Sequence, residues 1–485
     1  MSSPQLKPLI LLCDGTWCGR ETSTETNVYE LAKIIGIDFK TRADNEKDDI
    51  HFISQSNPAM KGKKGRYIHG VGLGSTFLDY VFNGITAQDI AEQCIGAYRY
   101  IVDNYVGGEY EIWMFGLSRG AYTIRCVAGM INNCGIVKRD NLSEIEIDLL
   151  CREVYRIYRS EYKIDEPGSA QSKAFRKGVS WPQIGEDDDD EASVVSTTNN
   201  SANEQKETRA PIRFMGLFDT VGSLGMPSFT GGVGLEWPGF YDQNVSSVVE
   251  HVYQATSLHD RMWVFEPCLA KRDSTKKKWG RRQKWNIHQK WFPGTHYDLG
   301  RQRFKFFRDG VGVSLAESLL AKIGLVSKVI EPNHVLADLV LKWMLESIKK
   351  HDANSLVIES FDKKAIIDGI LSNDRKIGDG DVYNHIVEYA PLGKLGLEVW
   401  KNLPGVGSHV NAIYELLFAL RDRHIPEDDA DVYDYKTPDP EISGRMSIQE
   451  LAGIPNTTGI KVEDEKKRYP SRTYDTWDLK RRLRL

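Results

Sequence analysis

Short apolar runs and amphipathic segments alternate along the first part of the chain. Residues 9–13 form an apolar run of strand length, and residues 49–54 predict a second strand. Residues 27–37 place apolar side chains at helical spacing, and residues 86–105 predict a longer helix that leads into an apolar strand at 110–115. This alternation predicts an α/β fold of the α/β-hydrolase type, with a mostly parallel central sheet flanked by helices.

The same alternation returns in the second half of the chain. Residues 212–218 and 286–292 predict further strands. Helical patterns follow at 312–323 and 335–350, and another lies at 411–421. The strands of both halves can therefore belong to one sheet.

An abrupt change in composition separates the two halves. From about residue 185 to 210 the chain carries an acidic run, Glu186 to Glu191, and then a tract rich in Ser, Thr, Asn and Glu. Such a segment buries too little apolar surface to offset its ordering entropy, which predicts a disordered surface insertion. We interpret the acidic run as a solvated linker because nothing in the sequence holds its carboxylates in the geometry of a metal site.

Composition excludes several classes of protein. The 485 residues carry a net charge of −5, which gives no reason to expect nucleic-acid binding. The seven cysteines are scattered without C-x-x-C spacing, which argues against a disulfide framework or a zinc cluster and predicts a reducing compartment. The N-terminus does not resemble a signal peptide, and no apolar run approaches the ~20 residues of a membrane span, so we expect a cytoplasmic protein.

Candidate chemistry begins at Ser118, within Gly116-Leu-Ser-Arg-Gly120. The apolar strand at 110–115 enters this turn, and apolar residues at helical spacing follow it. A strand–turn–helix with small residues two before and two after a serine is the setting of a nucleophilic serine. The alternative is a serine that only begins a helix, because G-x-S-x-G arises by chance in a chain with 42 glycines.

A nucleophilic serine needs a histidine base and a carboxylate that orients it. Asp219 follows the strand at 212–218, and His296 follows the strand at 286–292 in a Gly/Pro-bounded loop. The order Ser, Asp, His is that of α/β-hydrolases, and the carboxyl ends of parallel strands share one edge. The sequence therefore predicts a triad, although Asp219 alone could be a turn carboxylate and His296 a structural histidine.

An oxyanion hole must accompany the triad. The backbone amide of Arg119, next to the nucleophile, is one candidate donor. The loop that begins at Asp14 offers the second, from Gly15 or Thr16, because glycine permits close backbone approach. The alternative for this loop is a plain turn.

These motifs together resemble one known family. It is the α/β-hydrolase family that contains the catalytic domains of type VI secretion phospholipase effectors, with many uncharacterised fungal and bacterial members. The motifs that carry the resemblance, in order, are Cys13-Asp-Gly-Thr-Trp17, Thr26-Asn-Val28, Gly70-Val-Gly72, Phe115-Gly-Leu-Ser-Arg-Gly-Ala-Tyr122, Gly216-Leu-Phe-Asp-Thr-Val221 and Trp291-Phe-Pro-Gly-Thr-His-Tyr-Asp298.

The resemblance implies a site and a division of the chain. It places the family's nucleophile on Ser118, its acid on Asp219 and its base on His296, with Asp298 as a loop-stabilising second acid. It spans about residues 7–350, which we expect to be the catalytic domain.

The rest of the chain falls outside this resemblance. We expect a helical extension at 351–425 and a polar, partly extended tail at 426–485. One departure lies inside the catalytic domain, since Leu299-Gly-Arg-Gln-Arg303 stands where the family continues with glycines. This departure bears on the shape of the loop after His296 and not on the triad.

Other functions fit the sequence less well. Leu12 replaces the nucleophilic aspartate of haloacid-dehalogenase-like phosphatases, although Asp14-Gly-Thr resembles the rest of their motif. The glycines at 70–74 lack the residues of a P-loop or a dinucleotide fingerprint. The alternative from another class is a catalytically inactive α/β-hydrolase scaffold that acts as a binding or regulatory protein.

The resemblance implies lipid acyl esters as substrates and requires no cofactor. Residues 271–284 are basic and include Lys276, Lys277, Lys278 and Trp279. Such a stretch is typical either of contact with an anionic membrane or of a solvated basic loop. Some family members bind Ca²⁺, but this sequence has no EF-hand pattern or clustered carboxylate site.

Overall fold

The computed structural model describes residues 6–15, 25–37, 39, 62–70, 87–182, 211–221, 245, 248–261, 265–271, 286–305, 329–372, 422–426, 430–454 and 471–483. The strands are β1 (Lys7–Cys13), β2 (Lys64–Ile68), β3 (Tyr110–Leu117), β4 (Ile212–Phe218), β5 (Val249–Ser257), β6 (Asn286–Phe292), β7 (Phe304–Lys305), β8 (Val329–Ile330) and β9 (Asp431–Val432). A seven-stranded sheet has the order β2-β1-β3-β4-β5-β6-β9, and β7 pairs with β8 separately. Every neighbouring pair in the large sheet is parallel, which confirms the predicted fold class.

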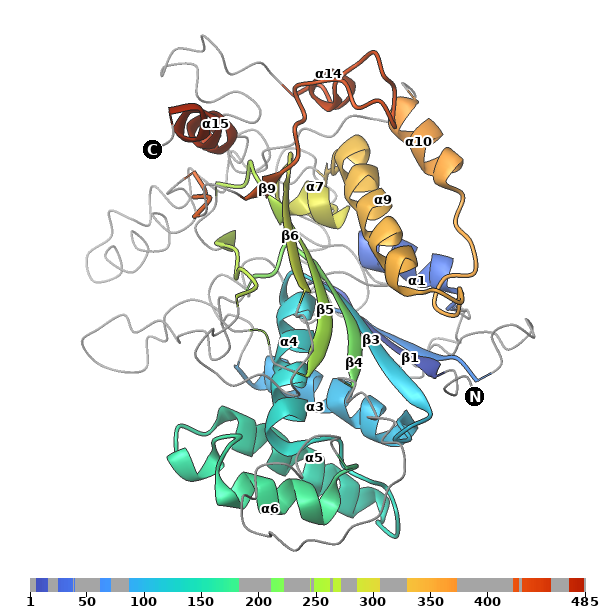
Figure 1. Ribbon diagram of the computed structural model, residues 1–485, viewed down its shortest axis with the longest axis vertical. Helices are drawn as coiled ribbons and strands as arrows, with labels where there is room; N and C mark the ends of the chain where they lie inside the picture. The colour runs from blue at the N-terminus through green and yellow to red at the C-terminus, as the bar shows by residue number, and fades with distance from the viewer. Residues whose placement is uncertain are drawn as a thin grey trace, which may run out of the picture.

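Helices cover both faces of this sheet. They are α1 (Asn27–Ile35), α3 (Ala87–Asn104), α4 (Arg119–Cys134), α5 (Glu144–Arg159), the 3₁₀ helix η3 (Lys163–Asp165), α6 (Ala170–Val179), α7 (His296–Gly300), α9 (His334–His351), α10 (Lys363–Leu371), α14 (Ile448–Leu451) and α15 (Thr473–Leu483). Figure 1 shows α3 and α4 on one side of the sheet with α5 and α6 beyond them, and α1, α9 and α10 on the other side.

The two layers explain why the strands read as continuous apolar runs. In β1, Ile10 and Leu12 belong to the apolar cluster on the α1 and α9 side, whereas Leu9, Leu11 and Cys13 belong to the cluster on the α3 and α4 side. A parallel strand buried on both faces needs apolar side chains at both alternating positions. The apolar run at 9–13 therefore predicted an interior strand.

Several predicted elements match the structure, and others do not fall within it. The predicted helices at 86–105 and 335–350 correspond to α3 and α9, and the predicted strands at 212–218 and 286–292 are β4 and β6. The predicted strand at 49–54 and the helices at 312–323 and 411–421 lie outside the described residues. The insertion predicted at about 185–210 also lies outside them.

Several elements were not predicted, among them β5, α5 and α6. β5 alternates apolar and polar side chains, including His251, Gln254 and Ser257, so it lacks the apolar run that identified its neighbours. The surface helices α5 and α6 bury only a narrow stripe, as the buried residues of α5 (Ile147, Cys151, Val154 and Ile157) illustrate.

The C-terminal part of the chain packs on the same sheet. β9 pairs with β6, and the ring of Tyr433 stacks on Phe292 with centroids 5.8 Å apart. Tyr474 and Trp477 of α15 belong to the apolar cluster that also contains Phe292. The region predicted as a polar, partly extended tail thus contains β9, α14 and α15. None of the helices that the structure describes is long and apolar enough to cross a membrane.

Candidate active site

Ser118 is the one residue between the end of β3 and the start of α4. Its backbone has φ 56° and ψ −118°, a conformation that residues with side chains rarely adopt. The Ser118 amide donates to the Phe218 carbonyl at 2.9 Å, and the Val221 amide donates to the Ser118 carbonyl at 3.4 Å. The turn is therefore both strained and tied to the end of the neighbouring strand β4.

The two glycines of the motif are required by close packing. A Cβ on Gly116 would lie 2.6 Å from the Ala121 nitrogen. A Cβ on Gly120 would lie 2.2 Å from the Cys13 carbonyl oxygen and 2.4 Å from that of Asp14. Helix α4 consequently begins directly against the end of β1, and this contact brings the Asp14 loop beside the Ser118 turn.

Asp219 and His296 meet at the same edge of the sheet. Asp219 follows β4 with φ 40°, and His296 is the first residue of α7, just after β6. His296 Nδ1 lies 2.7 Å from Asp219 Oδ2, and the two side chains are 1% and 0% exposed. Because an ionised carboxylate only accepts hydrogen bonds, Nδ1 donates and Nε2 is the ring atom that can accept a proton.

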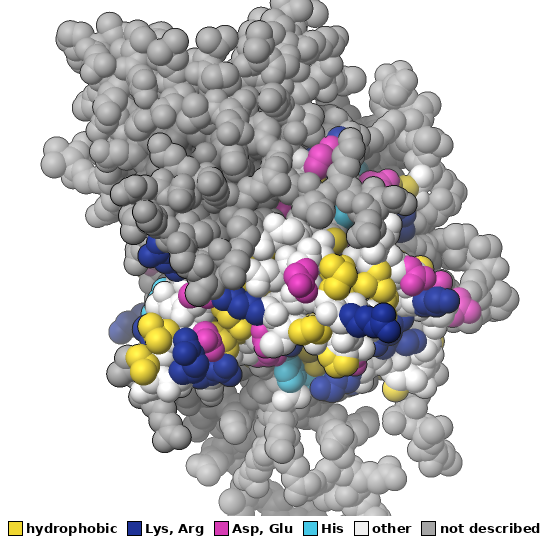
Figure 2. Space-filling view, turned by 90° about the horizontal axis from the view of Figure 1, so that it is seen from above, with side chains coloured by type: hydrophobic (Ala, Val, Ile, Leu, Met, Phe, Trp, Pro, Cys, Tyr) yellow, Lys and Arg dark blue, Asp and Glu magenta, His cyan; other side chains and the backbone are white. Residues whose placement is uncertain are grey.

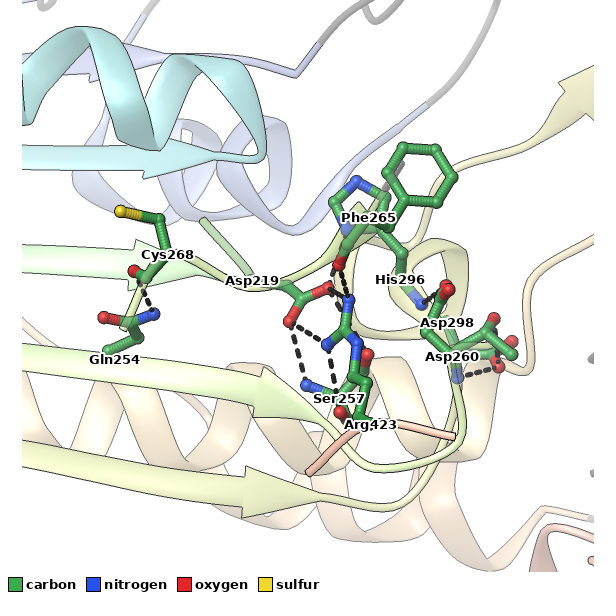
Figure 3. A network of polar contacts seen from close by, with 10 residues as sticks. Asp219, Gln254, Ser257, Asp260, Phe265, Cys268, His296, Asp298 and Arg423 are labelled. Carbon is green, nitrogen blue, oxygen red and sulfur yellow. Dashed lines mark hydrogen bonds and ion pairs between the residues drawn. The ribbon is translucent and has the colours of Figure 1, made fainter. Parts of the chain in front are cut away.

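A third charged group, Arg423, contacts the Asp219 carboxylate. Its Nη1 lies 2.7 Å from Oδ1 and its Nη2 lies 3.0 Å from Oδ2. Figure 3 shows the guanidinium beside the carboxylate. Burial by itself raises the pKa of Asp219, but the Arg423 guanidinium and the hydrogen bond with His296 together hold that pKa well below its usual value. The carboxylate is therefore ionised at neutral pH.

Sequence reasoning missed Arg423. It is one of 63 Lys and Arg residues and lies beside no motif. It also lies near the end of the helical extension expected at 351–425, beyond the expected catalytic domain. No local pattern distinguishes it from a solvated arginine, because its partner is about two hundred residues away in the sequence.

The loop that carries His296 is held by its own carboxylates. Asp298 Oδ2 accepts hydrogen bonds from the Thr295 amide at 2.8 Å and the Thr295 hydroxyl at 2.9 Å, and Asp298 Oδ1 accepts from the Asn333 amide at 2.7 Å. The His296 amide donates to Asp260 Oδ2 at 3.0 Å. These bonds give Asp298 a structural role in capping α7, while Asp219 contacts the imidazole.

Aromatic and histidine contacts complete this support. The Phe265 ring stacks on the His296 ring with centroids 4.4 Å apart and an interplanar angle of 11°. Nδ1 of His259 accepts a hydrogen bond from the Gly294 amide at 3.0 Å. Burial lowers the pKa of His259 to about 3, so this imidazole is neutral and able to accept.

The departure from the family pattern after Leu299 is accommodated at Arg301. This residue ends α7 with φ 54°, a left-handed conformation that glycine adopts most easily. Its Nε donates to Asn27 Oδ1 at 3.0 Å, and its guanidinium also pairs with Asp338. A Cβ on Gly300 would lie 2.8 Å from Leu117, so glycine is needed there.

Hydrogen bonds to the Asp14 carboxylate hold the loop that was expected to supply an oxyanion donor. The Gly15 amide donates to Asp14 Oδ1 at 2.7 Å, so it is engaged within its own turn. Thr26 Oγ1 donates to Asp14 Oδ2 at 2.6 Å, and the Tyr67 hydroxyl donates to the same oxygen. Burial raises the pKa of Asp14 to about 6 against the opposing effect of these hydrogen bonds.

The other two predicted oxyanion donors are Thr16 and the amide of Arg119. Thr16 lies outside the described residues. Arg119 is the first residue of α4, so its amide stands at the N-terminus of a sixteen-residue helix, where the helix dipole favours negative charge. Arg119 thus stays the stronger of the predicted donors.

The predicted membrane contact, Lys276 to Trp279, lies outside the described residues. Figure 2, which views the molecule from above, shows hydrophobic side chains interspersed with side chains of both charges among the coloured residues. Within the described part of the chain, no group of three or more His, Cys, Asp or Glu side chains is arranged to hold a metal ion.

Comparisons with known proteins give one curated relative and two solved structures of note. The chain is 25% identical over 194 residues to an uncharacterized protein of Saccharomyces cerevisiae, YEL023C. This region covers 39% of the chain but only 23% of the yeast protein.

Both structures are distant. The chain is 15% identical to the Tle1 effector bound to the VgrG spike from the type 6 secretion system, with a TM-score of 0.28, over 74% of this chain and 75% of that one. It is 13% identical to an uncharacterized protein from Pseudomonas aeruginosa, with a TM-score of 0.31, over 86% of this chain and 62% of that one.

The match to a family model is more extensive. It covers residues 7–347, and the family is described as the phospholipase effector Tle1-like catalytic domain of the type VI secretion system. The same residues contain Ser118, Asp219 and His296, whereas Arg423 lies beyond them. Because the match spans well over half of the sequence, the chain belongs to the Tle1-like phospholipase effector family.

Proposed function

We propose that this protein is a serine hydrolase that cleaves carboxylic esters, with phospholipid or other lipid acyl esters as its substrates. The observation that carries the proposal is the buried 2.7 Å contact between His296 Nδ1 and Asp219 Oδ2, at the strand edge that also holds Ser118 in its strained turn. The family's phospholipase description supports the choice of lipid esters.

The proposed reaction has two halves. Ser118 Oγ attacks the ester carbonyl while its proton passes to His296 Nε2, and the imidazolium is stabilised by ionised Asp219. The Arg119 amide donates to the oxyanion of the tetrahedral intermediate. The imidazolium then protonates the departing alcohol, which leaves an acyl group on Ser118.

Water completes the cycle by the reverse sequence of proton transfers. His296 takes a proton from the water as it attacks the acyl-enzyme, and then returns that proton to Ser118 Oγ as the free acid departs. No step needs a second enzyme group to change its charge, because Asp219 stays ionised throughout.

A panel of phospholipids and short soluble esters tests this proposal. We expect the wild-type protein to hydrolyse at least one lipid ester, and we expect Ser118→Ala to lose that activity. Ser172→Ala is a matched control, because Ser172 is a buried serine on α6, away from the carboxyl edge of the sheet. A wild type that is folded but inactive on the whole panel favours the inactive scaffold instead.

A further inference from the structure

A segment beyond the family match supplies a residue to the candidate triad. Arg423 lies in the stretch 422–426, and its side chain is 2% exposed. The two terminal nitrogens of its guanidinium face the two oxygens of Asp219, a bidentate arrangement that fixes the plane of the carboxylate as well as its charge. Figure 3 shows the guanidinium on one side of this carboxylate and His296 on another.

The arginine is itself held by other parts of the chain. Its Nη1 donates to the Ser257 carbonyl at 3.0 Å, and its Nη2 donates to the Phe265 carbonyl. The Arg423 carbonyl accepts a hydrogen bond from Thr473 Oγ1 at 2.9 Å, at the start of α15. The end of β5, the loop that follows it and the start of α15 therefore together fix the position of Arg423.

The hydrogen bonds of Asp219 show what Arg423 contributes. Oδ1 accepts from the Ser257 amide at 2.9 Å and from Arg423, while Oδ2 accepts from His296 and Arg423. The Ser257 hydroxyl adds a longer contact of 3.3 Å to Oδ2. Without the guanidinium, one amide and one long hydroxyl contact would have to orient the carboxylate toward the imidazole.

We propose that Arg423 is a positioning residue of the triad, which holds the Asp219 carboxylate ionised and oriented toward His296 Nδ1. It follows that residues outside the family match complete the active site. This inference rests on the proposed function only for its kinetic consequences, because the contact it concerns exists whatever the protein's substrate.

The charges around Asp219 determine the expected pH dependence. Arg423 from the C-terminal segment and His296 from α7 lower the pKa of Asp219, while burial raises it. Asp260, just after β5, and Glu266 also interact with Arg423. Without the guanidinium, burial and the neighbouring Asp260 would raise the pKa of Asp219, so the carboxylate would protonate at a higher pH.

Kinetics of Arg423→Gln and Arg423→Lys in the full chain test the proposal. For Arg423→Gln we expect kcat to fall by about 10- to 100-fold, as for outer partners that orient metal-bound histidines. We expect the acidic limb of the pH profile of kcat/KM to move to higher pH. Arg423→Lys keeps the charge but not the bidentate geometry, so its acidic limb should stay near that of the wild type while kcat falls.

Arg176→Gln is the control for loss of a buried arginine. Arg176 is 6% exposed and donates to backbone carbonyls of Asn133 and Pro167, on the α6 side of the molecule. We expect this variant to lose stability without a change in the acidic limb. If Arg423→Gln lowers kcat equally at every pH and leaves the acidic limb in place, the role of Arg423 is merely structural and the proposal is wrong.

A spectroscopic measurement separates this inference from the proposed function. The proton between His296 Nδ1 and Asp219 should give a low-field ¹H NMR signal that His296→Gln removes. In Arg423→Gln we expect this signal to be weaker, or to disappear at a higher pH than in the wild type as the pH is lowered. In Arg176→Gln we expect it to persist as in the wild type. An unchanged signal in Arg423→Gln would overturn the positioning role, whereas an inactive wild type with the expected NMR behaviour would contradict only the proposed hydrolase activity.

Discussion

Ser118 and Asp219 leave neighbouring parallel strands through backbone conformations with positive φ, 56° and 40° respectively. The Ser118 amide donates to Phe218, the residue before Asp219. The nucleophile and the acid of the proposed triad are therefore located relative to each other by backbone hydrogen bonds. The strands β3 and β4 hold these two residues in their strained conformations. Backbone strain of this kind costs free energy and is typical of functional sites.

The contact between α4 and the end of β1 gives a prediction about Gly120. In Gly120→Ala, the new Cβ would lie 2.2 Å from the Cys13 carbonyl oxygen, so α4 must move away from β1. We expect the free energy of unfolding to fall by about 1–3 kcal/mol, the usual cost of overpacking, and ester hydrolysis to fall with it. Urea denaturation and kcat/KM measure the two effects.

Gly96→Ala is the matched control for this substitution. Gly96 lies inside α3, and a Cβ there meets no atom within 4 Å. Alanine in a helix interior should therefore stabilise the protein by about 0.5–1 kcal/mol and leave hydrolysis unchanged. Equal stability of Gly120→Ala and the wild type would contradict the close packing.

The raised pKa of Asp14 predicts a pH-dependent difference in stability. Its folded-state pKa of about 6 exceeds the unfolded value of 3.8, so the folded protein binds this proton more tightly. The resulting stabilisation is complete below 3.8 and is lost as pH rises through about 6, for a total of about 3 kcal/mol at 1.36 kcal/mol per pH unit.

Denaturation of the wild type and Asp14→Asn at a series of pH values isolates this contribution. Asparagine does not titrate, so the difference in unfolding free energy between the two proteins should change in favour of the variant as pH rises from about 4 to 6. Other titrating groups are common to both proteins and cancel in the difference. A difference that is constant with pH would show that Asp14 binds its proton equally in the folded and unfolded states.

The basic stretch around Lys276 gives a prediction about membranes. Replacing Lys276, Lys277 and Lys278 with glutamine should weaken binding to anionic phospholipid vesicles, because each charge near such a surface contributes about 1 kcal/mol. Hydrolysis of a short soluble ester should not change, since the residues of the proposed triad are not replaced. Vesicle co-sedimentation measures the first quantity, and unchanged co-sedimentation would leave the stretch as a solvated loop.

The order of strands and candidate residues made much of the site predictable. Ser118 and Asp219 follow the apolar strands β3 and β4, His296 follows the more polar strand β6, and the carboxyl ends of parallel strands share an edge. The sequence also contains the two glycines, Gly116 and Gly120, that the close packing around Ser118 requires. The apolar runs of β3 and β4 were recognisable because these two strands are buried on both faces, whereas β6 is buried only at Trp291 and Phe292.

What the sequence did not reveal has a common physical cause. Arg423 approaches Asp219 only through tertiary packing, so no spacing in the sequence connects the two. The hydrogen bond from the Gly15 amide to Asp14 depends on a side-chain rotamer, which local composition does not determine. β5 was missed because a central strand with polar side chains at the site edge breaks the apolar pattern.

Labelling with a fluorophosphonate probe tests the central claim most directly, because the probe reacts with a serine only when a base activates it. We predict one probe per wild-type molecule, located on Ser118 by peptide mass spectrometry, and no labelling of Ser118→Ala. A folded wild type that stays unlabelled, or a label that persists in Ser118→Ala, would contradict the assignment of Ser118 as the nucleophile.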